Sequence, residues 1–120
     1  MAKILIVDDS RTSRRVLKSI LETEGHEIIG EACNGQEAVE QYCKLEPELV
    51  TMDITMPIMD GLAALQAIRE KDEKAKVVMI TAAGQKEKMT EAVKYGAAEF
   101  LTKPFNEREV LAVVKRIAGV

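Results

Sequence analysis

The sequence predicts an α/β fold in which a parallel sheet of five strands is covered by helices on both faces. Two observations lead to this prediction. Short runs of apolar and β-branched residues alternate along the chain with segments whose apolar residues recur at helical spacing. Two of the runs, "ILIV" and "VVMI", are continuously apolar, which is typical of strands buried on both faces. Residues 1–120 contain no linker or low-complexity tract, so we expect one domain.

The predicted strands are the short apolar runs. In chain order they are "KILIVD" (3–8), "EIIGEA" (27–32), "ELVTMD" (48–53), "KVVMIT" (76–81) and "EFLTK" (99–103). Each run has the length of an ordinary strand. Each is followed by a segment long enough for a helix, which is the pattern of repeated strand–helix units.

The predicted helices follow the strands and carry one apolar stripe each. In chain order the stripes are Val16, Leu17, Ile20 and Leu21; Ala38, Val39, Tyr42 and Leu45; Leu62, Leu65 and Ile68; Met89, Ala92 and Val93; and Val110, Leu111, Val114 and Ile117. Residues suited to cap helix N-termini are Ser10 or Asp9, Asn34, Asp60 and Asn106. Gly25 and Gly96 stand where helix ends favour a positive φ.

Right-handed crossovers leave few topologies for five such units. The commonest is the doubly wound (βα)5, flavodoxin-like fold with strand order 2-1-3-4-5. Ligands of such sheets bind outside the carboxyl ends of the strands, at the switch point between the first and third strands. We therefore expect the chemistry of this protein to depend on the residues that end the strands.

Composition excludes several classes of function. The formal net charge of −3 and the scarcity of aromatic residues argue against a nucleic-acid partner. No apolar run approaches the roughly 20 residues of a membrane helix. The first residues, "MAKILIVDD", lack the features of a secretory signal, so we expect a cytoplasmic protein. Cys33 and Cys43 are interpreted as reduced thiols, and His26 as a solvated turn residue without a zinc site.

Three carboxylates, a hydroxyl and an ammonium group end the predicted strands: Asp8 and Asp9, Asp53, Thr81, and Lys103. Any one of them alone could be a helix cap or a surface charge. Three carboxylates within about 5 Å of one another would repel by roughly 3 kcal/mol per pair, so a site that tolerates them normally holds a cation. A small set of hard oxygen ligands suits Mg²⁺.

A carboxylate, a metal ion and a lysine are the components of an aspartyl-phosphate site. Asp53 is the candidate nucleophile because it stands alone at its strand end. Asp8 and Asp9 are adjacent and have the appearance of a metal-holding pair. Lys103 supplies a positive charge that can pair with a carboxylate or with a phosphoryl oxygen.

The sequence resembles the receiver domain of two-component response regulators over its whole length. The matching pieces are "ILIVDDS", "NGQEAV", "ELVTMDITMPIMDG", "VVMITA" and "GAAEFLTKPF". The resemblance implies that Asp53 accepts a phosphoryl group from the phosphohistidine of a histidine kinase. It also implies that Asp8 and Asp9 serve the Mg²⁺ site, with the backbone carbonyl of Thr55 as a further ligand.

The resemblance assigns further roles near the site. Thr81 would move to hydrogen-bond the phosphoryl group, and Lys103 would pair with it. Phe100 matches a switch position coupled to the threonine, where many relatives carry Tyr; Phe lacks the hydroxyl that some partner contacts use. A cis peptide bond is implied at Lys103–Pro104.

Two positions beside the site are expected to tune the lifetime of the phosphoryl group. They are Thr55, two residues after Asp53, and Ala83, two residues after Thr81. Neither side chain carries an acid or an amide that could hold an attacking water molecule. We therefore expect modest intrinsic hydrolysis and assistance from a separate phosphatase.

Two surfaces are candidates for partner binding. Arg11, Arg14, Arg15 and Lys18 on the first helix form either an ordinary solvated face or a docking site for a kinase or phosphotransfer domain. Lys86, Lys88, Lys94, Tyr95 and Arg116 belong to the surface that serves as the output face in relatives, where Thr81 and Phe100 would bias its conformation.

The leading functional hypothesis is a monomeric signalling switch that acts by binding an effector and is not a metabolic enzyme, although it would catalyse its own phosphorylation and dephosphorylation. Among receivers it is most similar to the stand-alone chemotaxis regulators, which implies the flagellar motor switch as effector; "TMDITMP" and "AAGQKEKMTEAV" favour this.

The alternatives are a phosphorelay intermediate and a receiver domain cut from a longer regulator. An aspartyl-phosphate phosphatase or mutase is disfavoured because such enzymes usually need an acid at position 55. A nucleotide-binding domain is disfavoured because neither GxGxxG nor GxxxxGK[ST] occurs.

Overall fold

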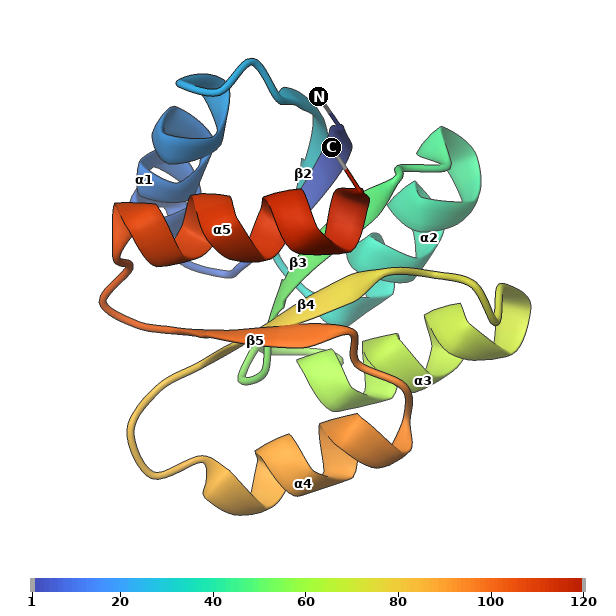
Figure 1. Cartoon of the computed structure of the whole chain (residues 1–120). Coiled ribbons are helices and arrows are strands. Elements are labelled where there is room, and N and C mark those ends of the chain that lie inside the picture. Colours follow the sequence, from blue (N-terminus) through green and yellow to red (C-terminus); the bar gives the residue numbers. More distant parts are fainter. Residues whose placement is uncertain (1, 120) are drawn as a thin grey trace.

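The computed structural model describes residues 2–119 as five consecutive strand–helix units (Figure 1). The strands are β1 (Lys3–Val7), β2 (Glu27–Ala32), β3 (Leu49–Asp53), β4 (Val77–Thr81) and β5 (Glu99–Thr102). The helices are α1 (Arg11–Glu22), α2 (Gly35–Leu45), α3 (Gly61–Lys71), α4 (Lys86–Lys94) and α5 (Glu107–Ala118). All strand pairs are parallel and the order is β2-β1-β3-β4-β5, so the predicted fold class and strand order are confirmed.

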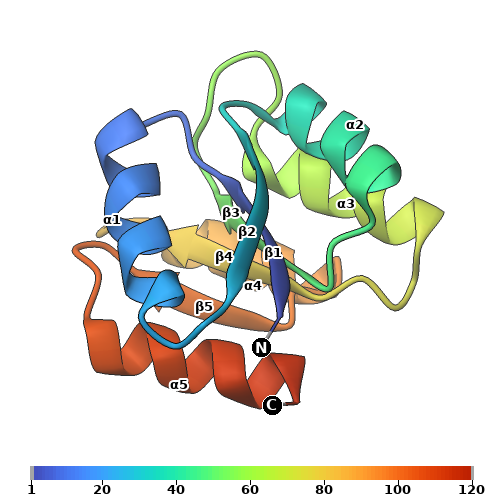
Figure 2. The same cartoon turned by 90° about the horizontal axis from the view of Figure 1, so that it is seen from above.

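The sheet separates two apolar cores. Helices α1 and α5 cover one face, and α2, α3 and α4 cover the other (Figures 1 and 2). Successive residues of β1 alternate between the cores, because side chains along a strand point to opposite faces: Ile4 and Ile6 join the α1–α5 core, whereas Leu5 and Val7 join the α2–α4 core. This alternation explains why the "ILIV" run is apolar at every position. Within residues 2–119, none of the helices combines the length and the hydrophobicity that a membrane span requires.

Four of the helices begin at the predicted capping residues. The side chains of Ser10, Asn34, Asp60 and Asn106 each accept a hydrogen bond from the backbone N–H three residues later. Helix α4 differs, because Gln85 stands before its first residue and makes no capping hydrogen bond. The predicted positive φ values of Gly25 and Gly96, which follow α1 and α4, are also confirmed.

Three of the expectations about burial are wrong. Val16 and Val93, which belong to the predicted apolar stripes, are 45% and 61% exposed. Both lie at the edge of their stripe, where helical spacing alone does not fix which side chain reaches the core. His26 is 7% exposed and not solvated, and its Nδ1 accepts a hydrogen bond from the Ala2 N–H at 3.0 Å. The imidazole thereby provides an acceptor for a backbone donor just before β1.

Candidate functional site

The carboxyl edge of the sheet brings the predicted site residues together. Asp53 ends β3 and Thr81 ends β4, while Asp8 and Lys103 follow β1 and β5 directly. Backbone hydrogen bonds fix the two residues that lie beyond their strands. The Asp8 N–H donates to the Ala32 carbonyl at 3.0 Å, and the Lys103 N–H donates to the Thr81 carbonyl at 2.9 Å. The expected convergence at this edge is confirmed.

Three carboxylates form the centre of the site. Asp8, Asp9 and Asp53 each offer an oxygen atom, and these atoms lie within 4.8 Å of one another. Asp8 and Asp53 are buried, whereas Asp9 is exposed. Lys103 Nζ lies 2.9 Å from Asp8 Oδ2 and 3.2 Å from Asp53 Oδ2, so one ammonium group pairs with both buried carboxylates.

The local electrostatics oppose the ionisation of Asp53. Burial, and next the nearby Asp8 carboxylate, raise the pKa of Asp53 from 3.8 to about 6, although Lys103 lowers it in part. Burial alone would lower the pKa of Lys103, but its contacts with Asp8 and Asp53 outweigh this and raise it, so Lys103 is a cation at neutral pH. A single ammonium group leaves the carboxylate cluster with an excess of negative charge.

The carboxylate cluster fits a hard divalent cation. Its donors are all carboxylate oxygens, which Mg²⁺ prefers. The buried Asp8 Oδ2 pairs with Lys103 but has no hydrogen-bond donor of good geometry within residues 2–119. The cluster is therefore compatible with Mg²⁺ held by Asp8, Asp9 and Asp53, as the sequence predicts. The Thr55 carbonyl as a further ligand stays a prediction.

The turn after β3 is tightly packed on Asp53. The Gly61 N–H, at the start of α3, donates to the Ile54 carbonyl at 2.7 Å. A Cβ atom at Gly61 would overlap the Asp53 backbone carbonyl. Glycine is therefore needed at this position, because the helix backbone directly supports the residue that ends β3.

Of the two predicted switch residues, Thr81 ends β4 and Phe100 lies within β5, and Thr81 is not hydrogen-bonded to Asp53. The Thr81 hydroxyl donates to the Leu101 carbonyl of β5 at 3.4 Å. Phe100, also in β5, is half-buried and packs against the α2–α4 core. The Lys103–Pro104 peptide bond is cis, as the resemblance implies. Thr81 would have to exchange its β5 partner in order to contact a group on Asp53.

Gln85 was not predicted from the sequence to contribute to this site. Its Oε1 accepts a hydrogen bond from the Ala82 N–H at 2.6 Å, and its Nε2 donates to Thr55 Oγ1 at 2.7 Å. Gln85 thus connects the loop after β4 with the turn after β3. The expectation of modest hydrolysis rests on the side chains at positions 55 and 83, whereas the fold also places the carboxamide of Gln85 against Thr55.

Each of the two predicted partner surfaces has one cation held in an ion pair. On α1, Arg14 donates to the Asp8 carbonyl at 2.7 Å and pairs with Glu31 at 2.9 Å, whereas Arg11 and Arg15 are exposed. A groove of about 500 Å³ beside α1 is lined by Thr12, Ser13, Val16, Lys103, Pro104 and Phe105. On the predicted output face, Arg116 pairs with Glu99.

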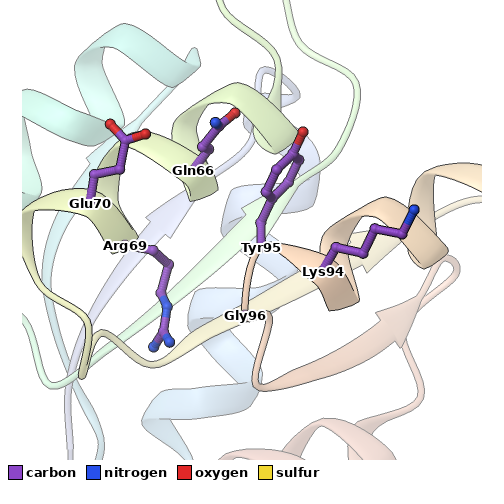
Figure 3. Close-up of a pocket in the computed structure, with 6 residues that line it drawn as sticks. All are labelled: Gln66, Arg69, Glu70, Lys94, Tyr95 and Gly96. Carbon is purple, nitrogen blue, oxygen red and sulfur yellow. The ribbon is translucent and has the colours of Figure 1, made fainter.

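A second cavity lies between α3 and α4, away from the carboxylate cluster. Its volume is about 360 Å³, and it is lined by Gln66, Arg69, Glu70, Lys94, Tyr95 and Gly96. Figure 3 shows the Tyr95 ring standing between the two helices, with Lys94 directed away from it. The Arg69 guanidinium lies near Gly96 and donates to the Ala75 carbonyl at 3.1 Å. None of the residues that end strands lines this cavity.

Comparisons with known proteins agree with the geometry. The family described as response regulator receiver domain matches residues 4–115. Protein CcdB of Bacillus subtilis is 47% identical over 99% of both chains, and the chemotaxis protein CheY of Thermotoga maritima is 44% identical over 97% of both. The crystal structure of a CheX–CheY–BeF₃–Mg²⁺ complex from Borrelia burgdorferi includes a chain that is 39% identical, with a TM-score of 0.91 and coverage of 96% of this chain and 87% of that one.

Proposed function

This chain belongs to the response regulator receiver domain family, and from that premise we propose that Asp53 accepts a phosphoryl group from a histidine kinase or a phosphotransfer domain. The observation that carries the proposal is the position of Asp53 at the sheet edge, with Lys103 Nζ at 3.2 Å and two further carboxylates nearby. An Asp53 oxygen would form a bond with phosphorus as the bond between phosphorus and the donor's imidazole nitrogen breaks.

The residues of the site have complementary roles in this proposal. Asp8 and Asp9, with Asp53, would hold Mg²⁺, which neutralises charge on the transferring oxygens. Lys103 pairs with Asp53 before transfer and with a phosphoryl oxygen afterwards. Thr81 would leave the Leu101 carbonyl to donate a hydrogen bond to the phosphoryl group, and Phe100 would respond to that movement.

Phosphorylation by a small-molecule donor tests the assignment of Asp53. We expect acetyl phosphate with Mg²⁺ to add one phosphoryl group to the wild-type protein, measured as intact mass. Asp53→Asn should remain unmodified because an amide is a poor nucleophile. Asp60→Asn is the matched control, since Asp60 caps α3 and lies outside the carboxylate cluster. Equal labelling of wild type and Asp53→Asn would refute the proposal.

We further propose that phosphorylation switches the affinity of this protein for an effector in chemotaxis, namely the flagellar motor switch. The similarity to CheY proteins of several organisms over nearly the whole chain supports this role. The CheX–CheY complex also supports the proposal of a separate protein partner, such as a phosphatase, that binds the phosphorylated form. The exposed Arg11 and Arg15, together with the groove beside α1, are the proposed docking site for the kinase.

An affinity capture experiment distinguishes the effector hypotheses. Immobilised wild-type protein is exposed to a lysate of its native host with and without beryllofluoride and Mg²⁺, and Asp53→Asn serves as the control. We expect motor-switch components to be retained only by the beryllofluoride form of the wild type. Retention of a phosphotransfer protein without any motor component would instead identify a phosphorelay intermediate.

A further inference from the structure

We propose that Gln85 is a positioning residue whose carboxamide holds the β4–α4 loop in its unphosphorylated conformation and competes with the phosphoryl group for the Ala82 N–H. The inference rests on the proposed function of Asp53. It adds a residue that limits how readily the site accepts a phosphoryl group or its mimic.

The Ala82 N–H lies at the end of the β3–β4 ladder, beside Asp53. The Ile54 N–H donates to the Ile80 carbonyl at 3.2 Å. If the parallel ladder continued, the Ala82 N–H would donate to the Ile54 carbonyl. The Gly61 N–H occupies that carbonyl instead, at 2.7 Å. The fold therefore leaves the Ala82 N–H without a backbone acceptor, immediately after Thr81 and next to the candidate phosphorylation site.

The Gln85 side chain accepts a hydrogen bond from the Ala82 N–H and donates one to Thr55. Its Oε1 accepts from the Ala82 N–H at 2.6 Å, and its Nε2 donates to Thr55 Oγ1 at 2.7 Å. The side chain is available because it makes no capping hydrogen bond to α4. We call this pair of hydrogen bonds the Gln85 latch. It joins the two loops that border the carboxylate cluster.

The latch and the Thr81 hydrogen bond belong to the same conformation. While the latch is closed, the Thr81 hydroxyl donates to the Leu101 carbonyl. A phosphoryl group on Asp53 would present several anionic oxygens that need hydrogen-bond donors. The Thr81 hydroxyl and the Ala82 N–H are two suitable donors at the end of β4, the strand that pairs with β3 and Asp53. Phosphorylation would therefore exchange Gln85 Oε1 for a phosphoryl oxygen at the Ala82 N–H, and the latch would open.

Loss of the latch should thus favour the phosphorylated conformation. A net hydrogen bond is worth enough to change a binding constant by roughly three- to tenfold. We expect Gln85→Ala and Thr55→Val to increase the affinity for beryllofluoride by about that factor. The double variant should gain no more than the larger single variant, because both substitutions open one latch. General structural damage would instead lower the affinity.

The test combines a titration with a measurement on the unliganded protein. Wild type, Gln85→Ala, Thr55→Val, the double variant and Asp53→Asn are titrated with beryllofluoride in Mg²⁺ and followed by amide NMR. Hydrogen exchange of the Ala82 amide is measured without Mg²⁺ or beryllofluoride and should be faster in Gln85→Ala. Gln66→Ala, which removes an exposed glutamine of α3, and Thr90→Val, whose hydroxyl donates within α4, are the matched controls and should resemble wild type.

Each outcome decides a different part of the inference. Unchanged exchange of the Ala82 amide in Gln85→Ala would show that the latch does not form. Unchanged or weakened beryllofluoride binding by Gln85→Ala, with normal binding by wild type, would show that the latch does not oppose the phosphorylated state. Failure of wild type to bind beryllofluoride in an Asp53-dependent manner would overturn the proposed function, and the role of Gln85 with it.

Discussion

At the scale of single residues, Asp53 occupies a position that disfavours its own charge. The pKa of Asp53 in the folded protein is about 6, above its ordinary value of 3.8, because of burial and the Asp8 carboxylate. As the pH rises between these values, the unfolded chain loses this proton before the folded protein does, so stability falls. Without a bound metal ion, the ionised Asp53 carboxylate therefore destabilises the folded protein at neutral pH.

Asp53→Asn should consequently stabilise the metal-free protein. Above pH 6 we expect its free energy of unfolding to exceed that of wild type by about 1–2 kcal/mol, after allowance for solvent screening. Urea denaturation in EDTA measures this difference, and the gain should disappear near pH 4. Saturating Mg²⁺ should stabilise wild type more than Asp53→Asn. A variant less stable than wild type in EDTA at pH 7.5 would contradict this view of the site.

His26 should make stability depend on pH at the opposite edge of the sheet. Burial lowers the pKa of His26 below its usual 6.5, with the Glu24 carboxylate opposing. The unfolded chain therefore binds a proton first as the pH falls below 6.5, and stability is lost. Protonation of Nδ1 would also remove the acceptor of the Ala2 N–H.

The matched variant for this prediction is His26→Asn, whose side-chain oxygen can accept the same hydrogen bond without titrating near neutral pH. Between pH 7 and pH 5, we expect the free energy of unfolding to fall further in wild type than in the variant. The difference should be roughly 0.5–1.5 kcal/mol, the net contribution of one hydrogen bond. Parallel stability profiles for the two proteins would exclude His26 as the titrating group.

At the scale of secondary structure elements, the start of α3 and the end of β3 depend on each other. Gly61→Ala should destabilise the protein by about 2 kcal/mol or more, although alanine is the better helix former, because its Cβ would collide with the Asp53 carbonyl. Thermal unfolding measures the loss. Gly119→Ala is the control: it has open space around its Cβ and a φ of +74°, so we expect only about 1 kcal/mol from backbone strain.

The same variant should also affect the site. A shift of the Asp53 carbonyl would move the carboxylate relative to Lys103, so we expect Gly61→Ala to slow phosphorylation by acetyl phosphate and Gly119→Ala to leave it unchanged. If Gly61→Ala were as stable and as reactive as wild type, the contact between α3 and Asp53 would not constrain the site.

The beginnings of the helices were more predictable from sequence than the faces that they bury. A cap depends on one short side chain and the backbone three residues later, so Ser10, Asn34 and Asp60 could be assigned locally. Burial depends on neighbouring elements. Val16 and Val93 satisfy helical spacing but are exposed, which no local pattern reveals.

At the scale of the whole molecule, the position of the site could be predicted because topology determines it. Parallel strands place all their carboxyl ends at one edge. The convergence of Asp8, Asp53, Thr81 and Lys103 can therefore be predicted without knowing any side-chain conformation. Gln85 and His26 could not be assigned in this way. Their roles depend on side-chain orientation and on backbone donors that lose their usual partners, which appear only in three dimensions.

The separation of the core by the sheet has a consequence for mutational robustness. Ile68 of α3 and Ile4 of β1 belong to different apolar clusters. Ile68→Val and Ile4→Val should each cost about 0.5–1.5 kcal/mol. The double variant should lose the sum of the two within about 0.5 kcal/mol. If denaturation experiments confirm this additivity, substitutions in the α1–α5 core will not change how much stability a substitution in the α2–α4 core costs. Each face of the sheet could then change in sequence independently, while both continue to support the carboxylate cluster at the edge of the sheet.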